Sequence, residues 1–168
     1  HAFALLRNKV LTDDPNLGAR LQLRLVGDGP QMRELQSLAG QLGIAGCSNF
    51  VGRVPHAKVP EELAKLDVFV ALSEIESFGV AVIEAGAASR PVVVSDAGGL
   101  PEVTLDGVTG FVVPRNRPEA AADAIERLVL DADLRRRMGI AGREHVATHY
   151  SWRACFGQMA EVYKSVLG

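Results

Sequence analysis

Residues 68–84 read Val-Phe-Val-Ala-Leu-Ser-Glu-Ile-Glu-Ser-Phe-Gly-Val-Ala-Val-Ile-Glu, and this stretch decides the fold class. Its first five residues are all apolar, which is typical of a strand that is buried on both faces of a parallel sheet. A polar loop with a glycine follows at 73–79, and the apolar residues from Val80 onward continue for the length of a helix. The stretch therefore predicts a strand, a loop and a helix, the repeating unit of α/β domains.

The same alternation of short apolar strands and longer helical patterns extends over the rest of the chain. Further strands are predicted at 21–26, 49–51, 91–94 and 110–113. Helices are predicted at 31–42, 59–65, 118–130 and 133–148, with one more from Ser151 to the end. This order predicts a doubly wound parallel α/β sheet with helices on both faces. The 168 residues have the length of a single domain.

The composition argues against several classes of partner. A formal net charge of −2 gives no reason to expect nucleic acid or an anionic membrane. Acidic residues precede the basic run Arg135, Arg136 and Arg137, so we interpret it as a solvated helix face rather than a phosphate-binding patch. Cys47 and Cys155 have neither metal-site nor disulfide-framework spacing, which favours a reducing, cytoplasmic setting. No apolar run approaches the roughly 18 residues that cross a bilayer.

Polar loops with glycines follow three of the predicted strands, at 27–29, 73–79 and 95–99. Glycines after strands usually mark turns, which is the simpler explanation for any one of these loops. Ligands of open α/β sheets bind where the strands end, however, and the three loops are predicted to share that edge. The sequence therefore predicts a ligand site there.

The loop at 73–79 contains the most informative residues of this edge. Ser77 is expected to cap a helix that begins near Phe78. The backbone amides at the start of that helix have no partner within it, and together with the helix dipole they favour binding of a phosphate. Gly79 allows a ligand to approach the backbone closely.

Glu84 is the only charged residue in the apolar helical stretch 80–88. An ionised carboxylate in such surroundings is costly unless it has partners. Two explanations remain open at this point. The partner is either a basic side chain in a structural ion pair, for instance Arg90, or the hydroxyl groups of a ligand.

Glu76 and Glu84, in the form Glu-Ser-Phe-Gly-Val-Ala-Val-Ile-Glu, resemble the paired glutamates of the retaining glycosyltransferases of family four. Further segments match that family in order and spacing: 25–30, 50–54, 67–70, 91–95, 98–102, 107–111 and 150–152. The resemblance covers nearly the whole chain. It implies the C-terminal half of a GT-B enzyme, an architecture of two Rossmann-like halves.

The resemblance also implies a domain organisation. Residues 1–150 would form the nucleotide-sugar-binding Rossmann-like domain, truncated at its N-terminus and lacking its first strand. Residues 151–168 would form a C-terminal helix that returns to a missing N-terminal domain. The chain begins without a methionine, in the middle of an amphipathic helical pattern at 1–7, so we interpret it as a fragment of a longer protein.

The site residues of the family are carried over position by position. Glu84 would hold the ribose hydroxyls, and Glu76, at the catalytic position, would hydrogen-bond the donor sugar and place its anomeric carbon. The donor-binding set that the resemblance implies is Gly27, Gly29, Val51, Arg53, Ser77, Phe78, Gly79, Val80 and Glu84. The segment 51–53 would contact the edge of the nucleobase. Neither a metal nor another cofactor is expected, because positive side chains and helix dipoles stabilise the departing diphosphate in this family.

The implied partners are a nucleotide-sugar donor, an acceptor such as a glycan or a glycolipid, and the missing N-terminal domain. The full-length enzyme would be cytoplasmic or peripheral at the inner face of the membrane. Two departures from the family are evident. Its diphosphate-gripping arginine and lysine are absent, since Arg7 and Lys9 do not fit that motif, and Leu72 stands where a proline is frequent. We expect no sugar transfer by this chain alone, because the acceptor-binding residues and the usual catalytic surroundings would lie in the missing N-terminal domain.

Other functions remain open. A non-catalytic nucleotide-binding module would keep the fold, although the costly polar residues Glu76 and Glu84 argue against it. A second alternative is another GT-B enzyme, such as a nucleotide-sugar epimerase or a phosphorylase, and the absence of lysines from the three loops disfavours a pyridoxal-dependent phosphorylase. His145 and His149 are spaced i, i+4 but lack the glutamate of a zinc-protease motif, so we interpret them as packing or surface residues. His56 is interpreted as an ordinary loop residue.

Overall fold

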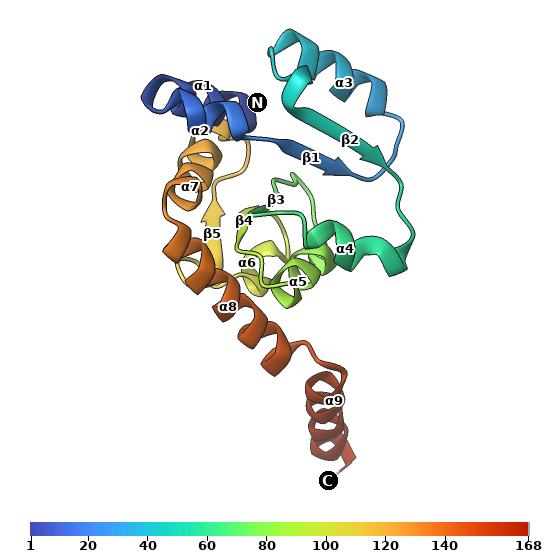
Figure 1. The fold of residues 1–168 in the computed structure, drawn as a ribbon. Helices are drawn as coiled ribbons and strands as arrows, with labels where there is room; N and C mark the ends of the chain where they lie inside the picture. The colour runs from blue at the N-terminus through green and yellow to red at the C-terminus, as the bar shows by residue number, and fades with distance from the viewer. Residues whose placement is uncertain (168) are drawn as a thin grey trace.

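The computed structural model describes residues 1–167 and contains five strands in two parallel sheets (Figure 1). In the first sheet, β1 (Leu23–Val26) pairs with β2 (Ser48–Gly52). The second sheet has the order β3 (Phe69–Ala71), β4 (Val92–Ser95) and β5 (Gly110–Val113). All five predicted strands are confirmed. Within the described residues β1 does not pair with β3, so the chain forms two sheets rather than one continuous sheet.

The three-stranded sheet lies between two layers of helices, as the sequence predicts. One layer consists of α4 (Val59–Leu63), α5 (Val80–Ala87) and α6 (Leu100–Val103), and the other of α1 (Ala2–Asp13) and α7 (Pro118–Leu130). The alternation of side chains along β4 shows why both layers are needed. Val92 and Val94 pack into the first layer, whereas Val93 packs into the second, and all three side chains are fully buried.

The two-stranded sheet has its own small core. Its cover consists of α1, α3 (Met32–Gln41) and the turn η1 (Ala45–Cys47), whose shared cluster contains Ala4, Ala39, Ile44 and Cys47. Arg24 of β1 is not part of this cluster. Its Nε donates to Oε2 of Glu62 at 2.6 Å. Because Glu62 belongs to α4, this half-buried ion pair connects the two-stranded sheet to the helices of the larger sheet.

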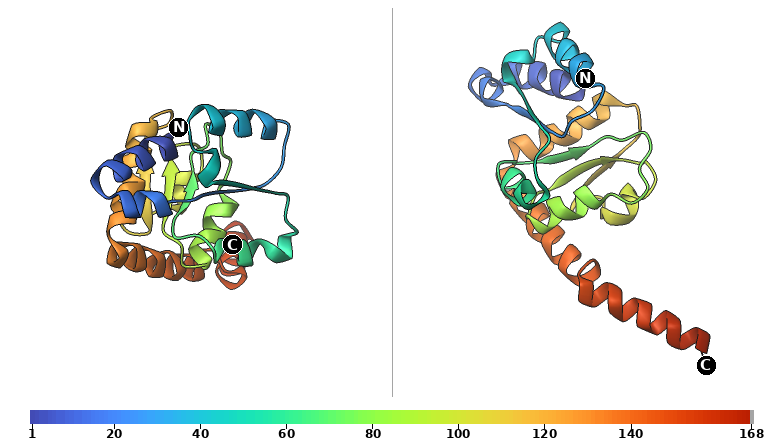
Figure 2. Two further views of the ribbon diagram at one scale, coloured as in Figure 1. Left: turned by 45° about the horizontal axis from the view of Figure 1, so that its top comes forward. Right: turned by 90° about the vertical axis from the view of Figure 1, so that its right-hand side faces the viewer.

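The remaining elements are helical. They are α2 (Pro15–Arg20), the turn η2 (His56–Lys58), α8 (Ala132–His149) and α9 (Trp152–Leu167). Helix α8 packs on α5, and the absence of side chains at Gly86 and Gly142 allows the two helices to approach closely. Helix α9 extends away from the rest of the molecule (Figure 2), and its large apolar side chains, among them Trp152 and Phe156, are exposed. Among residues 1–167, no helix combines the length and apolarity that crossing a membrane requires.

The predicted amphipathic helix at the start of the chain is confirmed as α1. Leu6 and Val10 are almost completely buried and pack against α7, which contributes Leu128 to the same cluster. Helix α7 itself begins at Pro118 and ends at Leu130, as predicted from the sequence. The fixed φ of proline suits the first helical turn, where its missing N–H is not needed.

We predict that Leu128→Ala lowers the free energy of unfolding by about 2–5 kcal/mol, because it leaves a cavity at a fully buried position between α1 and α7. Leu130→Ala is the matched control on the same helix. Since Leu130 is 62% exposed, its truncation should cost less than about 0.5 kcal/mol. Chemical denaturation of the two variants measures the difference, and equal losses would contradict the packing described for α7.

Candidate functional site

The loops that follow β3 and β4, which we call the rim, meet backbone to backbone. Gly98 has a φ of +47°, and a Cβ atom at this position would lie 1.7 Å from the carbonyl oxygen of Glu76. The amide of Gly99 donates to that same oxygen at 3.2 Å. A second link joins the strand ends, where the Ser95 hydroxyl donates to the carbonyl oxygen of Ser73 at 2.6 Å. The structure thus confirms that two of the three predicted loops share one edge.

Glu76 lies in the rim with its side chain folded back on its own loop. Oε1 accepts hydrogen bonds from the amides of Ser77 at 3.0 Å and Phe78 at 3.3 Å. The Phe78 amide, at the predicted helix start, is therefore bound to the Glu76 carboxylate, together with the amide of Ser77. An anion that uses them has to displace this side chain.

The prediction that Ser77 caps a helix beginning near Phe78 is wrong. Helix α5 begins at Val80, its N-cap is Gly79, and no side chain caps it. Gly79 has a φ of +96°, and a Cβ there would approach the side chains of Leu100 and Val103 to 3.1 and 3.2 Å. The chain therefore takes a left-handed turn at Gly79, close to α6, and the helix begins only after this turn.

This shift moves the free amides along the chain. Within residues 1–167, the amides of Gly79, Val80 and Ala81 have no hydrogen-bond acceptor. These are the orphan donors expected at a helix N-terminus, where the helix dipole also favours an anion. Val80 is 60% exposed, so a ligand can reach this end of α5.

Glu84 lies in the second turn of α5 with a side chain that is 32% exposed. The ion pair with Arg90 that the sequence left open is not formed. Arg90 instead donates from Nε to the carbonyl oxygen of Ala88 and from Nη1 to that of Leu66. The nearest basic group is Nδ1 of His56, 3.9 Å from Oε1 of Glu84. Because Glu84 keeps contact with solvent, its charge costs less than the apolar sequence around it suggests.

His56 is a residue of the site that the sequence analysis missed. It belongs to η2, three residues after Arg53 and four after the end of β2 at Gly52, and its side chain is 90% exposed. Its proximity to Glu84 places the loop after β2, which contains Arg53, on the same side of the molecule as α5, and Val51 lies near the end of β2 that leads into this loop. No local sequence pattern relates His56 to Glu84, because His56 lies in η2 after β2 whereas Glu84 lies in α5 after β3.

The loop after β1 forms its hydrogen bonds with residues other than the paired glutamates and their loop. The Gly27 amide donates to the carbonyl oxygen of Gly52 at 2.9 Å, and the Gly29 amide to the Asp28 carboxylate at 2.8 Å. In the part of the chain that the structure describes, no hydrogen bond joins Gly27 or Gly29 to loop 73–79. The structure therefore links this loop to the end of β2, and its place in the site remains a prediction.

Arg115 is a second residue that the sequence analysis missed. It follows β5 and connects three loops of the same edge. Its backbone amide and its Nε both donate to Oδ1 of Asp96, at 2.9 and 3.1 Å, and Nη1 lies 3.5 Å from the carbonyl oxygen of Glu74. The guanidinium is half exposed, so this edge carries a cation beside Asp96 and the backbone of Glu74.

Aromatic side chains at the C-terminal end of α8 pack against the rim. The ring of Tyr150 packs edge-to-face on Phe78 with 6.1 Å between centroids, and its hydroxyl donates to the carbonyl oxygen of Glu102 at 3.2 Å. His145 packs edge-to-face on the other side of Tyr150, 5.6 Å between centroids, and His149 lies 4.6 Å from His145. This agrees with the interpretation of the two histidines as packing residues.

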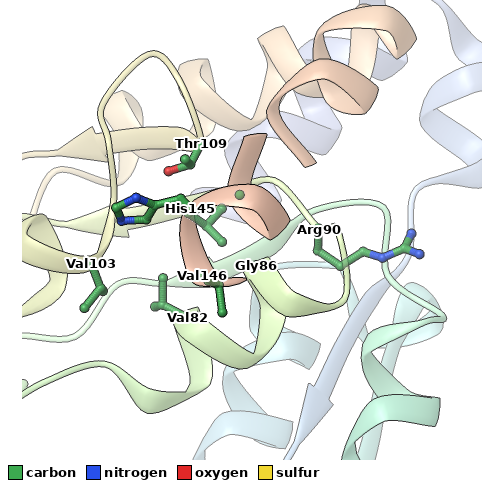
Figure 3. A pocket seen from close by; sticks show the side chains of 9 residues that line it. Val82, Gly86, Arg90, Val103, Thr109, His145 and Val146 are labelled. Carbon is green, nitrogen blue, oxygen red and sulfur yellow. The ribbon is translucent and has the colours of Figure 1, made fainter. Parts of the chain in front are cut away.

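A cavity of about 10 Å³ lies between α5 and α8, lined by His145, Val146, Val82 and Gly86 among others (Figure 3). Its volume is that of about one water molecule, so it is too small for a nucleotide or a sugar. Among residues 1–167, no three His, Cys, Asp or Glu side chains gather in a metal-binding arrangement.

Comparison with known proteins decides the family. The sequence model of the family described as Glycosyl transferases group 1 matches residues 1–145. The chain belongs to this family. A similar member is the GDP-mannose-dependent alpha-(1-6)-phosphatidylinositol monomannoside mannosyltransferase of Mycobacterium tuberculosis, which is 32% identical over 165 residues, 92% of this chain and 43% of that protein.

Solved structures agree with the assignment to the glycosyl transferases group 1 family. Sucrose-phosphate synthase from Thermosynechococcus elongatus matches with a TM-score of 0.81 at 30% identity, over 99% of this chain and 42% of the other. The Anabaena protein HepE in complex with UDP-glucose matches with a TM-score of 0.78 at 25% identity, over 89% of this chain and 43% of the other. The predicted fold, that of the C-terminal domain of GT-B glycosyltransferases, is confirmed. The chain spans less than half the length of the curated relatives that it matches.

The environment of the His145 ring leads to a prediction about how the free energy of unfolding depends on pH. Burial, with a smaller contribution from the nearby charge of His149, lowers the pKa of His145 below its ordinary value of 6.5. As the pH falls below 6.5, the unfolded chain therefore binds a proton that the folded chain resists. The free energy of unfolding should decrease between that pH and about pH 5.

Denaturation of His145→Gln over this pH range measures the effect, and part of the pH dependence should disappear because the titrating ring is gone. An unchanged profile in His145→Gln would contradict the assignment.

Proposed function

We propose that the chain is the donor-binding half of a glycosyltransferase that uses a nucleoside-diphosphate sugar. The observation that carries this proposal is the junction of the rim and α5, where Glu76, free amides and Glu84 lie within nine residues of a chain that belongs to the glycosyl transferases group 1 family. The names and titles of its relatives support a nucleotide sugar, since one depends on GDP-mannose and another binds UDP-glucose.

Each group of the junction fits one part of such a donor. The amides of Gly79, Val80 and Ala81 donate to the diphosphate at the N-terminus of α5. Glu84, farther along the helix, accepts hydrogen bonds from the two ribose hydroxyls, which suits a partly exposed carboxylate without a strong ion pair. His56 lies beside Glu84 and contributes to the nucleotide side of the site. Val51 and Arg53 then border the nucleobase.

Glu76 binds the donor sugar and places its anomeric carbon. In the structure its carboxylate caps the amides of Ser77 and Phe78, so donor binding exchanges these two hydrogen bonds for bonds to sugar hydroxyls. The amides released in this way become available to the sugar and the diphosphate. Glu76 thus occupies the same amides that the donor would use.

The complete reaction requires groups outside this chain. We propose transfer with retention of the anomeric configuration to an acceptor hydroxyl of a glycan or glycolipid, with an N-terminal domain supplying the acceptor side and without a metal. The exposed apolar face of α9 supports a return of this helix to that domain. The chain alone, incubated with donor and candidate acceptors, should then give no transfer product. Product formation would contradict the assignment of the acceptor side to an N-terminal domain.

The donor assignment is tested by calorimetric titration of the chain with UDP, GDP and their sugars. Glu84→Ala should weaken binding of every nucleotide by about tenfold or more, because hydrogen bonds to a charged acceptor contribute about 1.5–3 kcal/mol. Glu76→Ala should weaken the nucleotide sugars more than the bare nucleotides, since Glu76 is assigned to the sugar. Parent-like nucleotide binding by Glu84→Ala would rule out the ribose assignment.

Glu74→Ala is the matched control for both variants. Glu74 lies in the same loop as Glu76 and is exposed. Its backbone carbonyl accepts a hydrogen bond from Arg115, and its side chain forms no hydrogen bond or ion pair within the described residues. Its replacement should leave every affinity within about twofold of the parent. A loss as large as that of Glu84→Ala would show that general charge in the rim, rather than one positioned carboxylate, determines binding.

A further inference from the structure

A second pocket, of about 270 Å³, lies at the opposite edge of the three-stranded sheet from the rim. Asp67 and Pro91, which line it, come directly before β3 and β4, whereas the rim follows the other ends of the same strands. The far end of α5 and the first turns of α8 complete its wall. Its volume is near the lower end of the range of small-molecule sites, about 300 Å³. The proposed donor site does not use any of these residues.

Two arginines of this pocket are fixed by backbone carbonyls. Arg90 donates to the carbonyl oxygens of Ala88 and Leu66, and Figure 3 shows its guanidinium directed away from the small cavity beside His145. Arg135 donates from Nη1 to the carbonyl oxygens of Leu128 and Val129, at 2.6 and 2.9 Å. Within residues 1–167, neither guanidinium has a carboxylate within ion-pair distance. Both are half buried, so each holds a charge that no carboxylate compensates.

The charge of the lining is positive overall. A third arginine, Arg136, lies at its exposed side and shares its charge with Asp133 at 3.1 Å. Asp67 is the single acidic side chain among the lining residues that surround the pocket. The amides of Ala132 and Asp133, at the N-terminus of the long helix α8, have no acceptor in the part of the chain that the structure describes. Guanidinium groups held in fixed positions are well suited to the oxygens of a phosphate.

We propose that this pocket binds a phosphate group, either free phosphate or the phosphate of a small phosphomonoester. Arg90 and Arg135 donate from the nitrogens that the backbone carbonyls leave free, and Arg136 turns from Asp133 to the bound anion. The interpretation of Arg135, Arg136 and Arg137 as merely a solvated face is thereby revised for the first two, which line a pocket together with an arginine from another helix. The ligand and the donor occupy opposite ends of the sheet and do not compete.

The test is an NMR titration of the isotopically labelled chain with sodium phosphate, against sodium chloride at matched ionic strength. Saturable shifts are expected at the amides of Ser89, Ala132 and Asp133 and at the Nε–H signals of Arg90 and Arg135. Saturation with UDP beforehand should leave the phosphate affinity unchanged. Shifts confined to Gly79, Val80 and Ala81, or shifts reproduced by chloride, would overturn the proposal.

Three exposed positions give variants that are expected to fold as the parent does. Arg136→Gln should weaken phosphate binding about three- to fivefold, and Asp67→Asn should tighten it by a similar factor because it removes the repelling carboxylate. Arg137→Gln, which removes a neighbouring charge outside the lining, should change nothing. Equal effects of Arg136→Gln and Arg137→Gln on phosphate affinity would show that only the overall charge of this surface matters. That result would refute phosphate binding in the pocket.

A parallel titration with glycerol 3-phosphate distinguishes the two sources of the phosphate. Tighter binding than that of sodium phosphate assigns the pocket to a phosphomonoester, and equal binding assigns it to free phosphate. Because no residue of the donor site is altered, the outcome is independent of whether the chain binds a nucleotide sugar.

Discussion

The site depends on the close approach of two backbones. Gly98 and Gly99, after β4, lie directly against residues 76–78, after β3, at distances where any side chain would collide with main-chain atoms. The hydrogen bond from the Gly99 amide to the carbonyl oxygen of Glu76 fixes one loop on the other. Because main-chain atoms cannot move aside as the end of a side chain can, this contact sets the direction in which Glu76 and the following turn leave the sheet.

The consequences of this contact extend along α5. With residues 76–78 held by Gly99, the left-handed turn at Gly79 lies close to Leu100 and Val103 of α6, and Glu84 follows in the second turn of α5. Tyr150 then holds Phe78 from the other side and is itself anchored on α6 through Glu102. The paired glutamates are thus positioned by main-chain contacts and by packing from α8, rather than by ion pairs of their own.

The sequence predicts the parts of this structure that local patterns determine. The strand at 110–113 and the helix at 118–130 are predicted with the bounds that the structure gives, because buried apolar runs and a proline at a first turn are local signals. The start of α5 is not predicted correctly, since Ser77 is a good capping residue but the chain takes a left-handed turn at Gly79 before the helix begins at Val80. His56 and Arg115 join the site through contacts across the fold, for which no local pattern exists.

In the proposed donor site, acidic side chains lie beside the free amides of the α5 N-terminus. Glu76 and Glu84 are close to the amides that would receive a diphosphate, and the half-exposed Arg115 already shares its charge with Asp96. A diphosphate placed here therefore gains from the orphan amides and the helix dipole but meets nearby carboxylates. Stabilising the charge of a departing diphosphate requires further fixed cations. The positive pocket lies at the other end of the sheet, so its arginines are not placed to contact a diphosphate at the N-terminus of α5.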